Sequence, residues 1–310
     1  MNKAIVTGAN GFVGTALCRE LCKQGIQVIA VVRNKTEFIH KTKDLPGLTV
    51  VCSDLSRFRN LAETIPDRDI DILYHLAWEG SAGALRGDCD VQMDNVRYTC
   101  DTVNACADMG VKRFVFAASI VEYEINAVMS TEVTPEINTL YASAKTTADH
   151  MARAIAGSLG IDYIRAVISN IYGPGEMSPR LVNTTLKKML LGEHCAFSAG
   201  EQMYDFIYID DAVRAFAAIG EKGKANRTYY VGSQEPQKLK YFLIEMKNQI
   251  DPETEIGLGE IPFHGISLSY EEFDRNAVRN DTGFVPQVSF AEGIRNTVDW
   301  LREVIGNEDV

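Results

Sequence analysis

Tyr141 and Lys145 lie four residues apart and carry the side-chain types needed for proton transfer. They begin a stretch that is expected to be helical, residues 141–159, in which this spacing puts both side chains on one face. A phenol with its usual pKa of about 10 is a poor base at neutral pH, but a nearby ammonium group favours the phenolate. Tyr141 can therefore exchange a proton with a substrate oxygen.

Ser119 ends an apolar run at residues 113–118, which is expected to form a strand, and precedes Tyr141 by 22 residues. The carboxyl ends of parallel strands line the ligand crevice of an open α/β sheet. A hydroxyl in that position can hold the reacting carbonyl or alcohol beside the phenol. We therefore predict that Ser119, Tyr141 and Lys145 are catalytic and that Ser119 also contacts the substrate.

A glycine-rich turn, Thr7–Gly14, follows the first expected strand and opens the first expected helix. Gly8 permits the tight turn, Gly11 lets the backbone approach a pyrophosphate, and Gly14 lets helix and strand pack closely. Helix N-termini bind phosphate through free N–H groups and the positive end of the helix dipole. The turn is predicted to supply these residues to a dinucleotide site: Gly8, Asn10, Gly11, Phe12, Val13 and Gly14.

The end of the second expected strand, residues 27–32, distinguishes between the two nicotinamide cofactors. NAD-binding units usually carry an acid there, whereas a cation suits the 2′-phosphate of NADP. Arg33 occupies this position and no acid does. The prediction is NADP in preference to NAD, with Arg33 forming charge-assisted hydrogen bonds to the phosphate. An ordinary surface arginine is the alternative interpretation.

Further residues fall where a cofactor would pass. Asp54 and Leu55 follow the third expected strand, near the expected adenine position, and Asn95 on the long helix can brace the neighbouring loop. The remaining predicted cofactor contacts are Leu76, Ala77, Trp78, Tyr141 and Lys145.

Strands and helices alternate through the first 170 residues, and the strands are apolar on both faces. This pattern is typical of a parallel sheet covered by helices on both sides, the doubly wound arrangement. We expect a dinucleotide-binding Rossmann-type domain at residues 1–170, to which part of 205–235 returns. Residues 171–310 are expected to form mainly a smaller, interleaved substrate-binding lobe.

Composition narrows the possible partners. The net charge of −11 disfavours nucleic acid. The sequence has no apolar stretch long enough to span a membrane and no signal peptide, so we expect a cytoplasmic protein. Seven cysteines without CxxC spacing and five scattered histidines predict reduced thiols and no metal site.

Together these motifs resemble the extended short-chain dehydrogenase/reductase family, in particular its nucleotide-sugar epimerase, reductase and dehydratase branch. The resemblance extends over nearly the whole chain and includes Asn170–Gly175 and Asp205–Asp211. It implies a Ser-Tyr-Lys triad, a homodimer built on the two long helices, and contact between Asn170 and the substrate. Other predicted substrate contacts in the C-terminal lobe are Arg180, Asn183 and Arg275.

The sequence departs from the family pattern at several positions. Tyr204 and Val167 stand where an arginine is frequent, which leaves the nucleotide half of the substrate open. Dehydratases carry Asp-Glu directly after the hydroxyl residue, whereas Ile120–Val121 follow Ser119 here, which argues against dehydration. Glu122 comes next and is interpreted as facing solvent.

Three functions fit these residues. The leading one is a reductase that uses NADPH to reduce a 4-keto-6-deoxy nucleotide sugar. The second is a nucleotide-sugar 4-epimerase with tightly bound NAD, which would use the same catalytic residues. The third, a non-catalytic NADP-sensing protein, is disfavoured because such proteins usually lose the tyrosine or the lysine.

Overall fold

A seven-stranded parallel sheet dominates the computed structural model, which describes residues 1–130 and 134–308. The strand order is β11-β6-β5-β4-β1-β2-β3, and every neighbouring pair is parallel. The order reverses between β1 and β4, so this is the doubly wound arrangement that the sequence predicts. The strands are β1 (Lys3–Thr7), β2 (Gln27–Val32), β3 (Leu48–Cys52), β4 (Ile72–His75), β5 (Arg113–Ser119), β6 (Asp162–Ile168) and β11 (Thr228–Val231).

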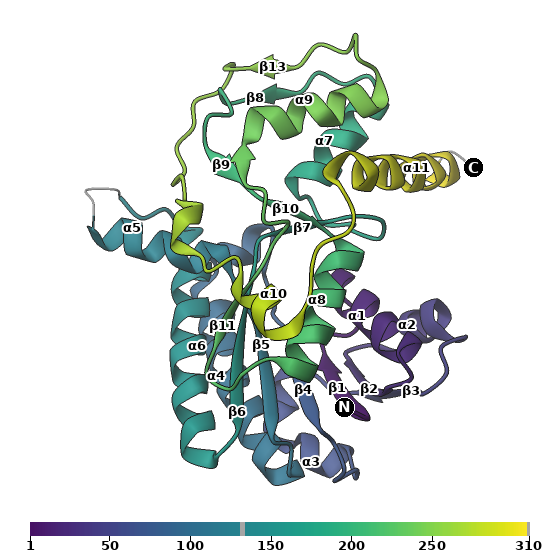
Figure 1. Cartoon of the computed structure of the whole chain (residues 1–310), viewed down its shortest axis with the longest axis vertical. Coiled ribbons are helices and arrows are strands. Elements are labelled where there is room, and N and C mark those ends of the chain that lie inside the picture. Colours follow the sequence, from purple (N-terminus) through teal and green to yellow (C-terminus); the bar gives the residue numbers. More distant parts are fainter. Residues whose placement is uncertain (131–133, 309–310) are drawn as a thin grey trace. The chain divides into compact units, whose positions relative to one another are not determined.

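Helices connect the strands and cover both faces of this sheet (Figure 1). The long helices α4 (Cys89–Met109) and α6 (Thr139–Leu159) pack against each other on one face, and α1 (Phe12–Lys23) and α8 (Ile209–Lys222) lie on the other. Shorter helices fill the remaining connections: α2 (Lys35–Thr42), η1 (Leu55–Asn60), α3 (Leu61–Thr64), η2 (Ala84–Gly87), η3 (Ile120–Tyr123), α5 (Glu124–Ser130) and α10 (Ala277–Thr282).

Neighbouring residues of β4 show how the two faces are separated. Tyr74 is fully buried against Gly220 of α8, where a Cβ would overlap its hydroxyl group. His75 points to the opposite face and lies 3.2 Å from the hydroxyl of Thr99 on α4. Its ring stacks with Phe114 and Phe116 of β5, and so the layer beneath α4 and α6 is aromatic. Successive side chains of a strand point to opposite faces of the sheet, so the side chains of β4 are buried on both faces.

The chain divides into two compact units. The first contains the large sheet and comprises residues 1–168, 213–231 and 276–284; the second comprises residues 169–212, 232–275 and 285–310. Within the second unit, three short strand pairs accompany the helices α7 (Leu181–Leu190), α9 (Leu239–Ile250), η4 (Tyr270–Glu272) and α11 (Phe290–Glu308). The paired strands are β7 (Asn170–Tyr172) with β10 (Phe206–Tyr208), β9 (Met203–Tyr204) with β12 (Gln237–Lys238), and β8 (Ala196–Phe197) with β13 (Gly257–Leu258).

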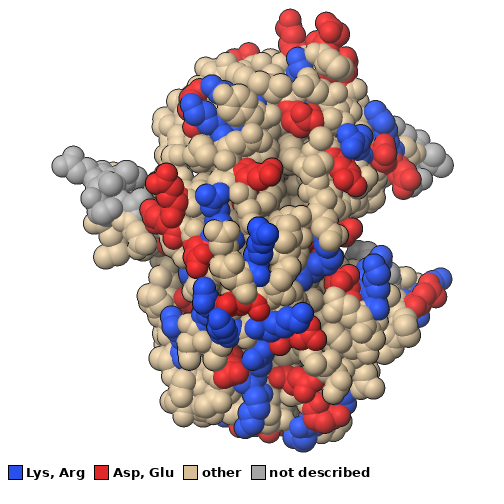
Figure 2. Space-filling model, in the orientation of Figure 1, with Lys and Arg blue, Asp and Glu red and all other residues tan. Residues whose placement is uncertain are grey.

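Two further properties of the fold are the distribution of charge on its surface and the hydropathy of its helices. Acidic and basic side chains are interspersed over the face shown in Figure 2, despite the net charge of −11. None of the helices in the described part of the chain combines the length and the apolar character needed to cross a membrane.

Candidate active site

The glycine turn between β1 and α1 is built to bring backbone close to a ligand. Gly8 has a φ of +68°, and a Cβ there would lie 2.7 Å from the backbone nitrogen of Ala77. A Cβ at Gly14 would overlap the carbonyl oxygen of Gly8. Gly11 is the N-cap of α1 and supplies no side-chain cap, so the first N–H groups of the helix face outward. The turn therefore fits the diphosphate of a dinucleotide.

The predicted cofactor residues of the turn differ in exposure. Gly14 is buried, Phe12 and Val13 are partly buried, and Asn10 is exposed. Leu76 and Ala77 lie directly against the turn, because the backbone of both is within contact distance of Gly8. The end of β4 and the glycine turn thus form one continuous surface at the point where the strand order reverses.

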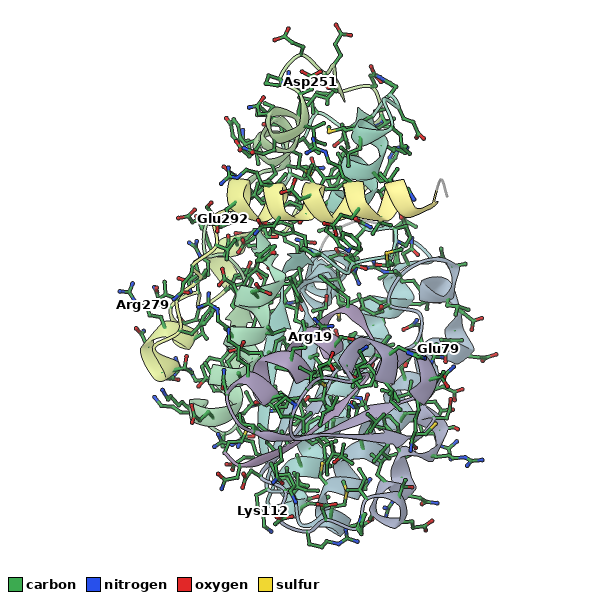
Figure 3. The ribbon with its side chains drawn as sticks, turned by 90° about the vertical axis from the view of Figure 1, so that its right-hand side faces the viewer. Arg19, Glu79, Lys112, Asp251, Arg279 and Glu292 are labelled. Carbon is green, nitrogen blue, oxygen red and sulfur yellow. The ribbon has the colours of Figure 1, made fainter. Side chains whose placement is uncertain are left out.

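Arg33, at the end of β2, pairs with an acid from the loop after β4. Its Nη1 lies 3.3 Å from Oε1 of Glu79, and both side chains are about half exposed (59% and 44%). Asn95 of α4 fixes Glu79 by accepting its N–H at 2.8 Å and donating to its carbonyl oxygen at 2.9 Å. The side chain of Asn95 therefore braces this loop. Glu79 is labelled in Figure 3, as is Arg19 on α1.

The carboxylate of Asp54 accepts hydrogen bonds from Ser56, two residues further along the chain. One carboxylate oxygen accepts from the N–H and the hydroxyl of Ser56, at 3.0 and 2.8 Å, and so caps η1. These hydrogen bonds lower the pKa of Asp54, with Arg33 and Arg57 contributing in the same direction. Leu55 is buried. An adenine contact by Asp54 would have to use the other carboxylate oxygen.

Tyr141 and Lys145 are both buried on α6, with 7% and 5% of their surface exposed. The ammonium group of Lys145 donates to the carbonyl oxygen of Ala117 at 2.9 Å. It also lies 3.8 Å from the ring centre of Trp78, which meets the ring of Tyr141 edge-on at 5.9 Å. Since Ala117 is two residues before Ser119, the structure brings Tyr141, Lys145 and Trp78 to the carboxyl end of β5, where Ser119 lies.

Two further residues belong to this group, and no motif in the sequence indicates either of them. Gln92 of α4 is buried; it accepts from the indole N–H of Trp78 at 3.0 Å and donates to the carbonyl oxygens of Gly80 and Leu85. The guanidinium carbon of Arg86, in η2, lies 4.7 Å from the ring centre of Tyr141. Gln92 thus fixes the loop that carries Arg86 to the phenol.

The interpretation of Glu122 as a solvent-facing residue is wrong. Glu122 is 4% exposed, and one carboxylate oxygen accepts from the N–H of Ser119 at 2.7 Å in a capping box that opens η3. Its other oxygen lies 2.6 Å from Nη2 of Arg165. The 3₁₀ turn after β5 folds Glu122 back over the strand end, and the adjacent strand β6 supplies the cation that a buried carboxylate needs.

Burial dominates the electrostatics of this centre. It lowers the pKa of Lys145 to about 7, and the negative charges of Glu122 and Asp149 oppose that shift. It also lowers the pKa of His75 to about 3, with Lys145 acting in the same direction. Burial raises the pKa of Glu122, and Arg165 opposes the change. Burial thus disfavours the charged form of Lys145, and the two carboxylates stabilise it.

Two predicted substrate residues of the second unit meet at Glu176. Asn183 donates to the carbonyl oxygen of Glu176 at 2.6 Å, and Nε of Arg180 lies 3.5 Å from its carboxylate. Arg180 is half exposed, at 49%, and the side-chain oxygen of Asn183 is buried without a hydrogen-bond partner among the described residues. Both side chains retain groups that can bind a further polar molecule.

The other two predicted substrate residues hold backbone near Asp205. Asn170 donates to the carbonyl oxygen of Asp205 at 3.0 Å, and Arg275 donates to that of Gln234 at 2.9 Å. The buried carboxylate of Asp205 in turn accepts from the N–H groups of Ser233 and Gln234. Asn170 and Arg275 thus belong to one hydrogen-bonded cluster of the second unit.

A parallel doubly wound sheet with a glycine turn and a buried Tyr-Lys pair defines a class of dinucleotide-dependent enzymes. The chain belongs to the NAD dependent epimerase/dehydratase family, whose model matches residues 4–232. It is 26% identical over 167 residues to the dTDP-glucose 4,6-dehydratase of Escherichia coli, a match that covers 52% of this chain and 46% of that protein. The chain thus spans about half the length of the first curated relatives that it matches.

Solved structures share the fold over nearly the full length. The UDP-N-acetylglucosamine 4-epimerase from Methanobrevibacter ruminantium M1, in complex with UDP-N-acetylmuramic acid, gives a TM-score of 0.81 at 20% identity, covering 98% of this chain and 99% of that one. The DesIV double mutant (dTDP-glucose 4,6-dehydratase) from Streptomyces venezuelae, with NAD and DAU bound, gives 0.82 at 24% identity, covering 98% of both chains.

Proposed function

We propose that this chain is an NAD(P)-dependent oxidoreductase acting on a nucleotide-activated sugar, with Ser119, Tyr141 and Lys145 as catalytic residues. The observation that carries the proposal is the burial of Tyr141 and Lys145 together at the carboxyl end of β5. The names of the solved neighbours support the substrate class, since they are nucleotide-sugar epimerases and a nucleotide-sugar dehydratase.

Each catalytic residue has a task that its surroundings support. The bound dinucleotide supplies or accepts a hydride. Tyr141 exchanges a proton with the reacting sugar oxygen, and the ammonium group of Lys145 and the guanidinium of Arg86 favour the phenolate. Ser119 donates a hydrogen bond to the same sugar oxygen. The glycine turn at Gly8–Gly14 binds the diphosphate of the dinucleotide, and Asn95 holds the adjoining loop.

The cofactor proposed for turnover is NADP, because Arg33 ends β2 where NAD-binding units carry an acid. The neighbours that name a cofactor name NAD or NADH, so NADP distinguishes this chain from them. The pair between Arg33 and Glu79 does not prevent phosphate binding, since half-exposed ion pairs contribute about 0–1 kcal/mol. A 2′-phosphate with two negative charges can therefore replace Glu79 as the partner of Arg33.

The reaction proposed is reduction of a 4-keto-6-deoxy nucleotide sugar, with Tyr141 donating the proton. Ile120–Val121 supply no carboxyl group for removing a neighbouring hydroxyl, so dehydration is disfavoured. A 4-epimerase is the second candidate, favoured by the family description and by neighbours that are 4-epimerases. In that case the same residues would move the proton of the C4 hydroxyl, while the hydride of C4 would pass to a tightly bound dinucleotide and return to the other face of the sugar.

Oxidation of NADPH, followed by its absorbance in the presence of 4-keto nucleotide sugars, tests the proposal. The Tyr141→Phe variant should lose roughly 10²–10⁴-fold in kcat, because the proton donor is removed. Tyr241→Phe, a change at a half-exposed tyrosine, is the matched control. Protein that purifies with tightly held NAD and interconverts 4-epimers would instead favour the epimerase. Turnover of no nucleotide sugar by either route would refute both.

We further propose that Asn170, Arg180, Asn183 and Arg275 contact the substrate, the last three from the lobe predicted at residues 171–310 and Asn170 from the position directly before it. Asn170, Asn183 and Arg275 donate to the carbonyl oxygens of Asp205, Glu176 and Gln234. Arg180 instead pairs with the carboxylate of Glu176. These contacts support the role, because amide and guanidinium groups carry further N–H groups that can donate to phosphate or sugar oxygens. A homodimer on α4 and α6 is also proposed, since both helices expose methionine.

A further inference from the structure

A buried cluster of four charged groups lies behind the catalytic pair. Nη2 of Arg165 lies 2.6 Å from Glu122, and its Nε lies 3.0 Å from Asp149. The side chains of Glu122 and Asp149 are 2% and 5% exposed, and that of Arg165 is 14% exposed. The negative charges of Glu122 and Asp149 also act on the buried ammonium group of Lys145, so two cations and two carboxylates interact in this part of the core.

The cluster connects the two segments that carry the proposed catalytic residues, the end of β5 and helix α6, through the neighbouring strand β6. Glu122 lies on η3, three residues after Ser119; Asp149 lies on α6, one turn after Lys145; and Arg165 lies on β6 and pairs with both carboxylates. Tyr163, also on β6, donates its hydroxyl to Asp149 at 2.7 Å. A shift of any one of these elements would therefore break a buried ion pair.

Glu122 is the member of the cluster that contacts both the end of β5 and the neighbouring strand β6. Its Oε1 accepts from the N–H of Ser119, and its Oε2 meets Arg165. A residue that does not touch the reacting atoms acts by fixing the geometry and charge of the residues that do. Apolar packing would cover the strand end as well as a carboxylate does, so a buried anion here calls for an explanation beyond packing.

We propose that Glu122 is a positioning residue of the catalytic centre, which fixes the backbone of Ser119 and, with Asp149, keeps Lys145 in its charged form. The inference rests on the proposed function, in which Ser119 and Lys145 are catalytic. A charged Lys145 is required because only the ammonium form favours the phenolate of Tyr141.

The surroundings of Lys145 decide the direction of the expected change. Carboxylates reach it from η3 and α6, and Arg165 on β6 carries the opposing charge. Other titratable groups on β4, α6 and β6 include His75, Tyr141 and Tyr163. Burial already lowers the pKa of Lys145 to about 7, and loss of one carboxylate lowers it further.

Two substitutions of Glu122 separate the effect of its negative charge from the effect of its side-chain length. Glu122→Gln keeps an acceptor for the N–H of Ser119 and removes the charge, so the pKa of Lys145 should fall by roughly one unit or more. Glu122→Asp keeps the charge but is too short to reach both partners. It should therefore leave that pKa within a few tenths of the wild-type value and lower kcat without shifting the pH profile.

The pKa of Lys145 is measured directly by NMR of ¹⁵N-labelled lysine side chains, with Lys145→Met assigning the signal. This measurement needs no substrate, so it stands even if the proposed reaction fails. In turnover assays, the basic limb of the pH profile should move to lower pH in Glu122→Gln. Glu63→Gln, a change at an exposed glutamate, is the control and should alter neither quantity.

An unchanged Lys145 pKa in folded Glu122→Gln would overturn the charge role, and unchanged kcat in Glu122→Asp would overturn the role in holding Ser119. Thermal unfolding establishes whether each variant is folded. If Glu122→Gln does not fold, Asp149→Asn removes the other carboxylate and leaves the bond to Ser119 in place. It should lower the same pKa, and its failure to do so would contradict the proposal.

Discussion

Charge at the proposed catalytic centre is set by single side chains that the fold removes from water. Lys145 has its pKa lowered to about 7 by burial, even with the carboxylates of Glu122 and Asp149 opposing the shift. The ammonium form is therefore costly in the folded protein and is maintained by specific neighbours. This cost has a measurable effect on stability.

The stability of the wild-type protein relative to a Lys145→Met variant should depend on pH. The folded-state pKa of Lys145 is about 7 and its ordinary value is 10.5, so the folded protein binds fewer protons between these values. Wild-type stability should therefore rise with pH across this window, relative to the variant, by up to about 1.4 kcal/mol per pH unit. Urea unfolding below, within and above the window measures it. Lys112→Met, at an exposed lysine, should show no such trend, and a constant difference for Lys145→Met would contradict the argument.

Arg33 is the residue that should decide between the two cofactors. In Arg33→Asp, the new carboxylate repels a 2′-phosphate and accepts hydrogen bonds from ribose hydroxyls. We expect the Kd for NADPH to rise at least tenfold relative to that for NADH, equivalent to about 1.4 kcal/mol. Fluorescence titration with both cofactors measures the ratio. Lys23→Asp, the same charge reversal at the far end of α1, should leave it unchanged; a similar ratio in Arg33→Asp would favour the surface interpretation of Arg33.

At the scale of elements, the junction of β1 and α1 depends on glycines packed against backbone. Gly14→Ala should lower the free energy of unfolding by about 1–3 kcal/mol and abolish cofactor binding, because the new Cβ overlaps the carbonyl oxygen of Gly8. Gly157→Ala is the matched control: nothing lies within 4 Å of a Cβ there, and alanine favours the helix by about 0.5–1 kcal/mol. Guanidinium unfolding distinguishes the two. Equal stability of both variants would show that the junction can relax.

Elements with strong periodicity could be predicted from the sequence, and those that depend on tertiary contacts could not. The strands expected at residues 27–32 and 113–118 and the helix expected at 141–159 appear close to those bounds, as β2, β5 and α6, because apolar residues recur on their buried faces. The short helices α2, η1, α3 and α5 do not follow from such periodicity. These segments are short, so propensity alone does not determine them.

The same distinction applies to the candidate site. Tyr141 and Lys145 are recognisable because their spacing is local to one helix. Gln92 and Glu122 act through partners 14 and 43 residues away, Trp78 and Arg165, and no local pattern encodes such contacts. Burial of Glu122 also requires Arg165 on the neighbouring strand, and strand pairing is not visible in the sequence around Glu122.

At the scale of the whole molecule, the proposed dimer predicts that substitutions in its interface halve the mass of the particle in solution. Met93 on α4 and Met151 on α6 are 57% and 49% exposed, on helices that pack together. Replacing both by glutamate should convert a dimer into a folded monomer, because charges in an apolar interface are not compensated. Sedimentation velocity measures the change, and Met177→Glu, at a methionine that is 66% exposed, is the control. A wild-type protein that sediments as a monomer would contradict the dimer.

The sheet takes its last strand from a distant part of the chain. β11 pairs with β6, but residues 169–212, which separate the two in sequence, belong to the second unit. During synthesis on the ribosome, β6 therefore emerges with one edge unpaired until residues 228–231 follow it. Unpaired strand edges are templates for aggregation. A nascent chain interrupted before β11 would thus be a substrate for chaperones, although it already contains every residue of the catalytic group.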